Sequence, residues 1–140
     1  MVTTVDSTEI AKFNAMAEAW WDLHGDFKPL HQLNPTRIGF IRDTAARHFG
    51  RTAGGDAPLD GLTLCEIGSG GGLLTEPMRR LGAEVTGVDP SPRNIGIARA
   101  HAESSGLKIT YLQCAAEDMV ERGESFDIVL AMEVVEHVAN

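Results

Sequence analysis

The sequence predicts an α/β protein in which a helical arm precedes a parallel sheet. From residue 62 onward, short apolar runs with strand character alternate with helical segments, a pattern typical of parallel strands joined by helical crossovers. The residues before this point instead carry apolar side chains at helical spacing. We therefore expect an arm over residues 1–50, a connector over 51–61 and a Rossmann-like unit over 62–140, of which only four strands are present.

The arm is expected to begin with a helix over residues 6–21. Asp6 is a suitable N-cap, and the apolar side chains then recur at helical spacing through Phe13 to Trp20. Two interpretations of the end of this helix are open. Its apolar face packs on the core, or Trp20 and Trp21 cover a ligand pocket.

A second helix is expected over residues 35–49, because Asn34 is a good cap and Pro35 suits the first helical position. This start would place Arg37 in the first turn, where a cation opposes the helix dipole by about 0.3 to 1 kcal/mol. Either Arg37 pairs with a nearby acid, or it binds an anionic group of a ligand. The following residues, 51–61, are rich in Gly, Pro and Asp and form the connector.

The sheet is expected to alternate strands with helices in the order that a parallel sheet requires. One well-marked helix follows Ser91 as its cap, has Pro92 in its first position and ends before Gly106. A short acidic turn is expected over residues 115–118. The expected strands are 62–67, 84–89, 109–114 and 126–132, and a further helix covers 73–81.

Composition excludes several classes of function. The chain carries 12 Lys plus Arg against 20 Asp plus Glu, a net charge of −8, with the basic residues scattered. We therefore expect no nucleic-acid partner. No apolar run approaches the roughly 18 to 20 residues that cross a bilayer, and the polar start resembles no secretory signal, so we expect a cytoplasmic protein. Cys65 and Cys114 lack zinc-site spacing and are expected to be buried free thiols.

A glycine-rich loop follows the first expected strand. Gly68, Gly70 and Gly72 form a GxGxG pattern between a strand and a helix, where the backbone can approach a ligand at the carboxyl edge of the sheet. The alternative is a simple chain reversal, for which so many glycines would be entropically costly. The dinucleotide fingerprint needs a third glycine at position 73, which is Leu73, and no P-loop lysine follows. NAD and nucleoside triphosphates are therefore disfavoured.

Acidic residues at the strand ends indicate what the loop binds. Asp89 lies 21 residues beyond Gly68 at the end of the second strand, where an acid accepts hydrogen bonds from ribose hydroxyls. Ala116 and Glu117, after the third strand, are candidates to contact an adenine ring, although acids there also cap helices. Glu66 would face positive groups, which favours S-adenosylmethionine, with its sulfonium and ammonium and no phosphate, over an anionic dinucleotide.

Three ligand-type side chains follow the fourth expected strand. Glu133, Glu136 and His137 have i, i+3, i+4 spacing, so on a helix they would share one side. Two carboxylates and an imidazole suit a hard divalent ion. The competing interpretation is that they order the loop or accept a proton without a metal.

The segment 66–72, Asp89 and the fourth-strand segment resemble the class I S-adenosylmethionine-dependent methyltransferases. Residues 9–41 and 131–138 are similar, more specifically, to the O-methyltransferases of ubiquinone biosynthesis, which methylate polyprenylated catechol and ubiquinol precursors. The resemblance runs from about Ser7 to Asn140. It departs from the family pattern at Glu66, where the family usually has Asp, and at Ser69, where it usually has Cys.

The resemblance implies roles for particular residues. Arg37, Gly68, Asp89 and Met132 would contact the methyl donor, with Arg37 on its methionine carboxylate. The ExxEH segment, which metal-dependent eukaryotic relatives share, would bind Mg²⁺ through Glu133, Glu136 and His137. His137 and Glu133 would then be the catalytic residues.

The resemblance also implies a larger setting. A full domain of this family has seven strands with the fourth in the centre, so we expect the 140 residues to be part of such a domain. The prenylated acceptor would bring weak peripheral contact with the inner membrane, and other ubiquinone-biosynthesis proteins are candidate partners. A methyltransferase with another acceptor, or a noncatalytic cofactor-binding module, remains an alternative.

Overall fold

The computed structural model describes residues 7–132 of the chain. Within this range helices and strands alternate after two N-terminal helices, as the sequence predicts. The elements are α1 (Ser7–Trp21), α2 (Lys28–His48), β1 (Thr63–Ile67), α3 (Thr75–Arg80), β2 (Glu84–Asp89), α4 (Pro92–Ser104), β3 (Thr110–Gln113), α5 (Ala116–Glu121) and β4 (Ile128–Leu130).

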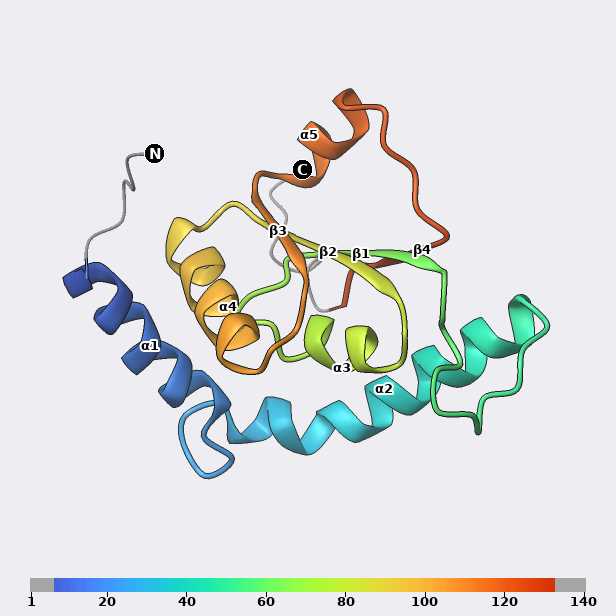
Figure 1. Ribbon diagram of the computed structural model, residues 1–140, viewed down its shortest axis with the longest axis horizontal. Coiled ribbons are helices and arrows are strands. Elements are labelled where there is room, and N and C mark those ends of the chain that lie inside the picture. Colours follow the sequence, from blue (N-terminus) through green and yellow to red (C-terminus); the bar gives the residue numbers. More distant parts are fainter. Residues whose placement is uncertain (1–6, 133–140) are drawn as a thin grey trace.

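The strands form one parallel sheet in the order β3-β2-β1-β4. Figure 1 shows α2, α3 and α4 on one face of this sheet and α5 on the other. The predicted α/β class and parallel topology are confirmed over the described residues. Because β1 is central, its carboxyl end and the glycine loop after it lie between the neighbouring strands β2 and β4, where ligands bind in open α/β sheets.

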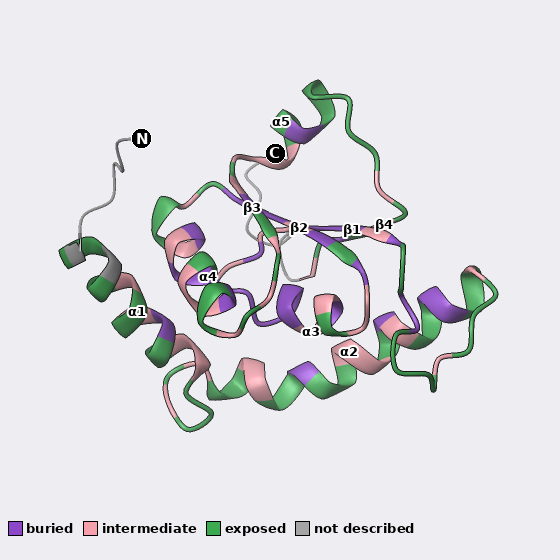
Figure 2. Cartoon of the chain, in the orientation of Figure 1, coloured by how far each residue is buried: buried purple, intermediate pink, exposed green. Residues whose placement is uncertain are grey.

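Alternate side chains of β1 enter the cores on the two faces of the sheet. Leu64 packs with Met78 of α3 and Ile41 of α2, whereas Cys65 packs with Val88 and with Met119 of α5. This alternation is the period-2 pattern of a strand covered on both faces. Figure 2 shows the consequence, since the central strands are largely buried while α1 is exposed along much of its length.

The start of α2 corrects the prediction for the second helix. The helix begins at Lys28, with Pro29 in its first turn, so Pro29 takes the place expected for Pro35, which lies inside the helix. Asn34 does not cap this helix: its side chain is buried and bonds across to Leu73. Arg37 therefore lies well inside α2, and the predicted conflict with the dipole at the helix start does not arise.

Smaller corrections concern the ends of other elements. The acidic turn expected at 115–118 opens the helix α5, because Asp118 accepts a hydrogen bond from the Ala115 amide at 2.8 Å. Cys114 is only half-buried, although both cysteines are free thiols as predicted. β2 spans the predicted residues, and Ser91 caps α4 by accepting from the Asn94 amide. None of the described helices is long and apolar enough to cross a membrane.

Candidate functional site

A pocket of about 150 Å³ lies where the glycine loop meets the helical arm. It joins the end of β1 to the end of α1 and to α2, which are distant in sequence. Five of the predicted cofactor residues, Arg37, Glu66, Gly68, Gly70 and Met132, are brought together in its wall. The complete lining is Trp20, Leu30, Arg37, Glu66, Gly68, Ser69, Gly70, Leu73, Leu74 and Met132.

Glu66 is the central polar group of this pocket. Its side chain is 5% exposed, and within the described residues its Oε1 atom has no hydrogen-bond partner. Burial raises the pKa of Glu66 to about 8, although the nearby charge of Arg37 acts in the opposite direction. A buried carboxyl group without a partner is costly, and such groups concentrate at ligand sites.

Backbone hydrogen bonds and positive φ angles fix the conformation of the glycine loop. The amides of Gly68 and Ser69 both donate to the carbonyl of Val88, at 2.8 and 3.0 Å, which anchors the loop to β2. Gly68 and Gly70 have φ values of 70° and 55°, in the left-handed region that favours glycine. The Ser69 hydroxyl is a second buried polar atom with no partner among the described residues.

Asp89 lies at the end of β2, as predicted, and supports the loop. Its carboxylate accepts hydrogen bonds from the Gly70 amide at 3.0 Å and from the Ser91 amide at 2.9 Å. These bonds connect the glycine loop to the start of α4. Asp89 does not line the pocket, so its contact with a ribose stays a prediction.

Besides Asp89, three of the predicted cofactor residues lie outside the pocket wall. Gly72 packs closely against β3, because a Cβ there would come within 2.9 Å of the Tyr111 hydroxyl, and its predicted contact with the cofactor stays a prediction. Ala116 and Glu117 lie in the first turn of α5, and Glu117 is exposed. Their predicted contact with adenine is untested.

The predicted metal and catalytic residues Glu133, Glu136 and His137 lie outside the described residues. Within residues 7–132, no group of three or more His, Cys, Asp or Glu side chains is arranged to hold a metal ion. The Mg²⁺ hypothesis therefore stays a prediction from the sequence.

The two tryptophans at the end of α1 cover the glycine loop. Trp20 lines the pocket, and the Trp21 indole donates to the carbonyl of Gly71 at 3.2 Å. Further along α1, Phe13 fills the space left by the missing side chain of Gly96 on α4. Of the two interpretations of Trp20 and Trp21, the structure supports the covering role.

Replacing Gly71 with alanine is expected to displace the Trp20 ring from the glycine loop and to destabilise the fold. The added Cβ would lie 2.5 Å from the Trp20 ring, so the indole must move. Overpacking of this kind costs about 1 to 3 kcal/mol. Thermal unfolding of Gly71→Ala should show this loss, whereas Gly54→Ala, with open space around it, should unfold like the parent. Equal stability of the two variants would contradict the contact.

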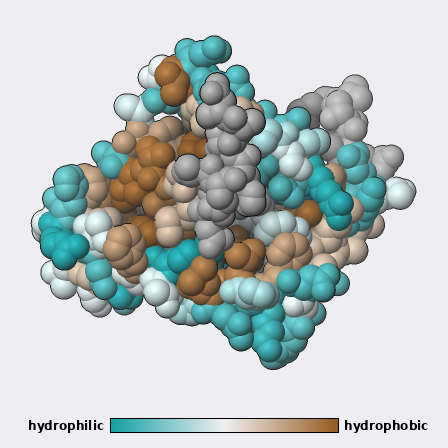
Figure 3. Space-filling view, turned by 180° about the vertical axis from the view of Figure 1, so that it is seen from behind, coloured by the Kyte–Doolittle hydropathy of each residue, from teal (hydrophilic) through white to brown (hydrophobic). Residues whose placement is uncertain are grey.

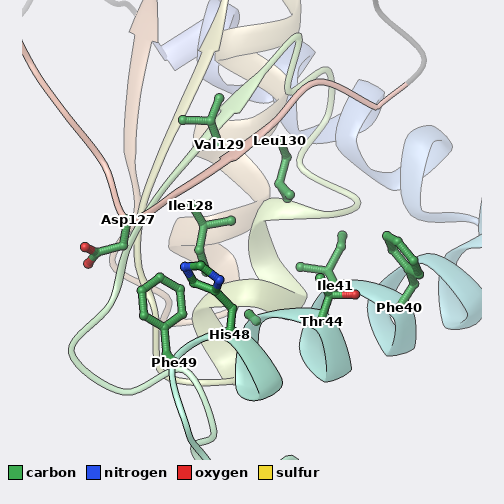
Figure 4. A pocket seen from close by; sticks show the side chains of 10 residues that line it. Phe40, Ile41, Thr44, His48, Phe49, Asp127, Ile128, Val129 and Leu130 are labelled. Carbon is green, nitrogen blue, oxygen red and sulfur yellow. The ribbon is translucent and has the colours of Figure 1, made fainter.

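A second cavity, of about 280 Å³, lies between α2 and β4. Figure 4 shows Ile128 and Leu130 of β4 pointing toward α2, with Phe49 and Ile41 on the helix side. The one carboxylate in the wall, Asp127, already accepts from the amide and hydroxyl of Thr63. This cavity is mostly apolar and lacks converging polar groups, so it is not the candidate site. Figure 3 shows that apolar side chains also gather on the outside of the molecule.

The family model described as a methyltransferase domain matches residues 65–140. The chain belongs to this methyltransferase family. Two curated relatives, the ubiquinone biosynthesis O-methyltransferases of Sinorhizobium medicae and Cereibacter sphaeroides, are each 56% identical to it over 138 residues. These alignments cover 99% of this chain and 56% of each relative, so the chain spans little more than half the length of those proteins.

Solved structures support the same fold for this chain. Magnesium protoporphyrin IX methyltransferase from Synechocystis PCC 6803, solved with bound SAM, superposes with a TM-score of 0.64. It is 21% identical, and the match covers 99% of this chain and 67% of that one. At this identity the likeness shows the fold alone, and it includes the helical arm as well as the sheet.

Proposed function

We propose that the chain is the cofactor-binding part of an S-adenosylmethionine-dependent O-methyltransferase that acts on polyprenylated catechol and ubiquinol precursors in ubiquinone biosynthesis. The observation that carries this proposal is the 56% identity to ubiquinone biosynthesis O-methyltransferases along 99% of the chain. The identity extends over the helical arm, which contributes Trp20 and Arg37 to the pocket. A shared glycine loop alone would not distinguish one methyltransferase substrate from another.

The polar groups of the pocket fit the amino-acid end of S-adenosylmethionine. Glu66 offers an unpartnered carboxyl oxygen to the ammonium group, and Arg37 offers a cation to the carboxylate. The pocket volume of about 150 Å³ is below the range of roughly 300 to 1,000 Å³ that encloses a whole small molecule. We infer that it takes the methionine portion, with the nucleoside extending toward Asp89.

When bound, S-adenosylmethionine supplies an electrophilic methyl group on a sulfonium. The residues of this chain bind and orient that group and exclude water. Trp20 covers the loop, while Glu66 and Arg37 of the same pocket hold opposite charges of the donor in place. Transfer to a phenolate oxygen then depends mainly on alignment in a site from which water is excluded.

The acceptor must lose its phenolic proton, because a phenol with a pKa of about 10 is a weak nucleophile at neutral pH. On the sequence alone, His137 is the proposed base, and Glu133 and Glu136 join it in the proposed Mg²⁺ site.

His137→Ala and Glu133→Gln are expected to lower turnover by about 100-fold or more while leaving donor affinity near that of the parent. Single-turnover methyl transfer and calorimetric titration of the donor measure the two effects. Unchanged transfer rates would remove this cluster from the mechanism.

The proposed reaction is tested with labelled S-adenosylmethionine and a short-chain prenylated catechol. Label is expected to enter the catechol oxygen, and less of it should enter a catechol without the prenyl chain. A parallel reaction with a chelator tests the proposed Mg²⁺. Donor binding without transfer to any catechol would indicate a noncatalytic module, and efficient transfer to unprenylated phenols would indicate a different acceptor.

We also propose a cytoplasmic enzyme with weak peripheral contact at the inner membrane, since a prenylated acceptor partitions into lipid. Other ubiquinone-biosynthesis proteins are proposed partners on the same ground. Co-sedimentation of the intact protein with anionic vesicles that carry the prenylated substrate is the expected result. Complete recovery in the supernatant would contradict the membrane contact.

A further inference from the structure

We propose that Asn34 is a positioning residue that joins the glycine loop to Arg37 and thereby sets where the donor carboxylate binds. This inference rests on the proposed function, because it acts through the contact of Arg37 with S-adenosylmethionine. Asn34 itself does not line the pocket. Its effect is therefore indirect, through the two groups that it bonds.

The geometry places Asn34 between the loop and the cation. Its Nδ2 atom donates to the carbonyl of Leu73, at the end of the glycine loop, at 2.6 Å. Its Oδ1 atom accepts from Nη2 of Arg37, one turn further along α2, at 2.9 Å. The side chain is 8% exposed, so water does not readily replace either bond.

These two partners require an amide at position 34. A carbonyl only accepts and a guanidinium only donates, so the amide has one possible orientation and uses both of its ends. Aspartate would keep the acceptor for Arg37 but would place an oxygen against the Leu73 carbonyl. It would also offset the charge that Arg37 presents to a carboxylate ligand.

The proline inside α2 makes the helical conformation of Asn34 unusual. Pro35 follows Asn34 directly, and a residue before proline is disfavoured in the helical region. Asn34 is nevertheless helical, which is consistent with its being held there by the bonds to Leu73 and Arg37. The arm and the loop are thus coupled at one side chain, and a shift of the loop changes the direction of Arg37.

The test compares two ligands that differ at the amino-acid end. S-adenosylhomocysteine carries the carboxylate, whereas 5′-methylthioadenosine keeps the nucleoside and sulfur but lacks the amino-acid group. In the intact protein, Asn34→Asp is expected to weaken S-adenosylhomocysteine binding about tenfold, with the affinity for 5′-methylthioadenosine changed less than twofold. Asn14→Asp makes the same chemical change at an exposed site on α1 and should alter neither affinity.

If Asn34 had only a structural role, Asn34→Asp would lower the affinity for both ligands by a similar factor, and that result would overturn the proposal. Unchanged affinity for both ligands would overturn it as well. If Asn34→Asp fails to fold, Asn34→Ser, which removes both bonds without adding charge, is judged by the same ratio of affinities. Arg37→Gln separates this inference from the proposed function. If Arg37→Gln selectively lowers the affinity for S-adenosylhomocysteine but the Asn34 variants do not, the inference alone is overturned. If Arg37→Gln causes no such selective loss of affinity, both the inference and the proposed function are overturned.

Discussion

Glu66→Gln is expected to weaken the binding of S-adenosylhomocysteine and to remove its dependence on pH. A charge-assisted hydrogen bond to a buried carboxylate contributes about 2 kcal/mol, which corresponds to roughly thirtyfold in affinity. The isosteric amide keeps the size of the side chain and loses the charge. The loss should therefore come from electrostatics rather than from a change in packing.

The direction of the pH effect follows from the raised pKa of Glu66. Because that pKa is about 8 in the free protein, the carboxyl group is largely protonated below it and must lose a proton to bind an ammonium. Affinity is therefore expected to rise between pH 6 and 7.5, by up to about tenfold per pH unit. Titration in buffers of different ionisation enthalpy should show proton release in the parent and none in Glu66→Gln.

The same group affects folding stability with a definite sign. Between its ordinary value of 4.5 and about 8, Glu66 is protonated in the folded state and ionised in the unfolded state. The folded state then binds more protons, so this contribution to stability falls as pH rises through that window. Denaturant unfolding of Glu66→Gln should lack this decline. If the parent and Glu66→Gln showed the same pH dependence of both binding and stability, Glu66 would not be the group that titrates in the pocket.

His101→Ala is expected to destabilise the fold by about 3 kcal/mol, because it leaves a buried carboxylate without its partner. Glu76, in the first turn of α3, is 2% exposed and bonds to Nδ1 of His101 on α4 at 2.6 Å. The His101 ring also stacks on Trp21, with centroids 3.8 Å apart. The imidazole of this α4 residue therefore contacts both α3 and the end of α1.

The control for this variant removes both polar partners. In Glu76→Leu/His101→Leu the buried charge is absent, so most of the lost stability should return. The double variant would still lack the stacking between His101 and Trp21. Urea unfolding of the single and double variants measures the difference. A His101→Ala protein as stable as the parent would show that the Glu76 carboxylate does not depend on this contact.

The sheet and the glycine loop were predictable from sequence because their signals are local. The strand character of residues 84–89, the cap at Ser91 and the spacing from Gly68 to Asp89 each involve neighbouring or regularly spaced residues. The family match and the superposition agree with that prediction. The bond from Asp89 to the Gly70 amide shows why an acid at that position also stabilises the loop.

The arm was harder to predict because its contacts are distant in sequence. Asn34 and Pro35 carry an ordinary helix-start signal, yet Asn34 bonds to a carbonyl 39 residues away. Nothing near position 34 indicates that partner. The packing around Gly72 could not be predicted for a similar reason, since the Tyr111 side chain that fills the space beside it comes from β3. Trp20, Trp21 and Arg37 were the residues of the arm that the sequence offered as candidates to contact a ligand.

A crystal structure of the protein with S-adenosylhomocysteine tests the central claim most directly. The account predicts the homocysteine carboxylate against Arg37, the ammonium against Glu66 and the ribose hydroxyls within reach of Asp89. An empty pocket at saturating ligand, or a dinucleotide whose pyrophosphate occupies the glycine loop in a parallel soak with NAD, would contradict it.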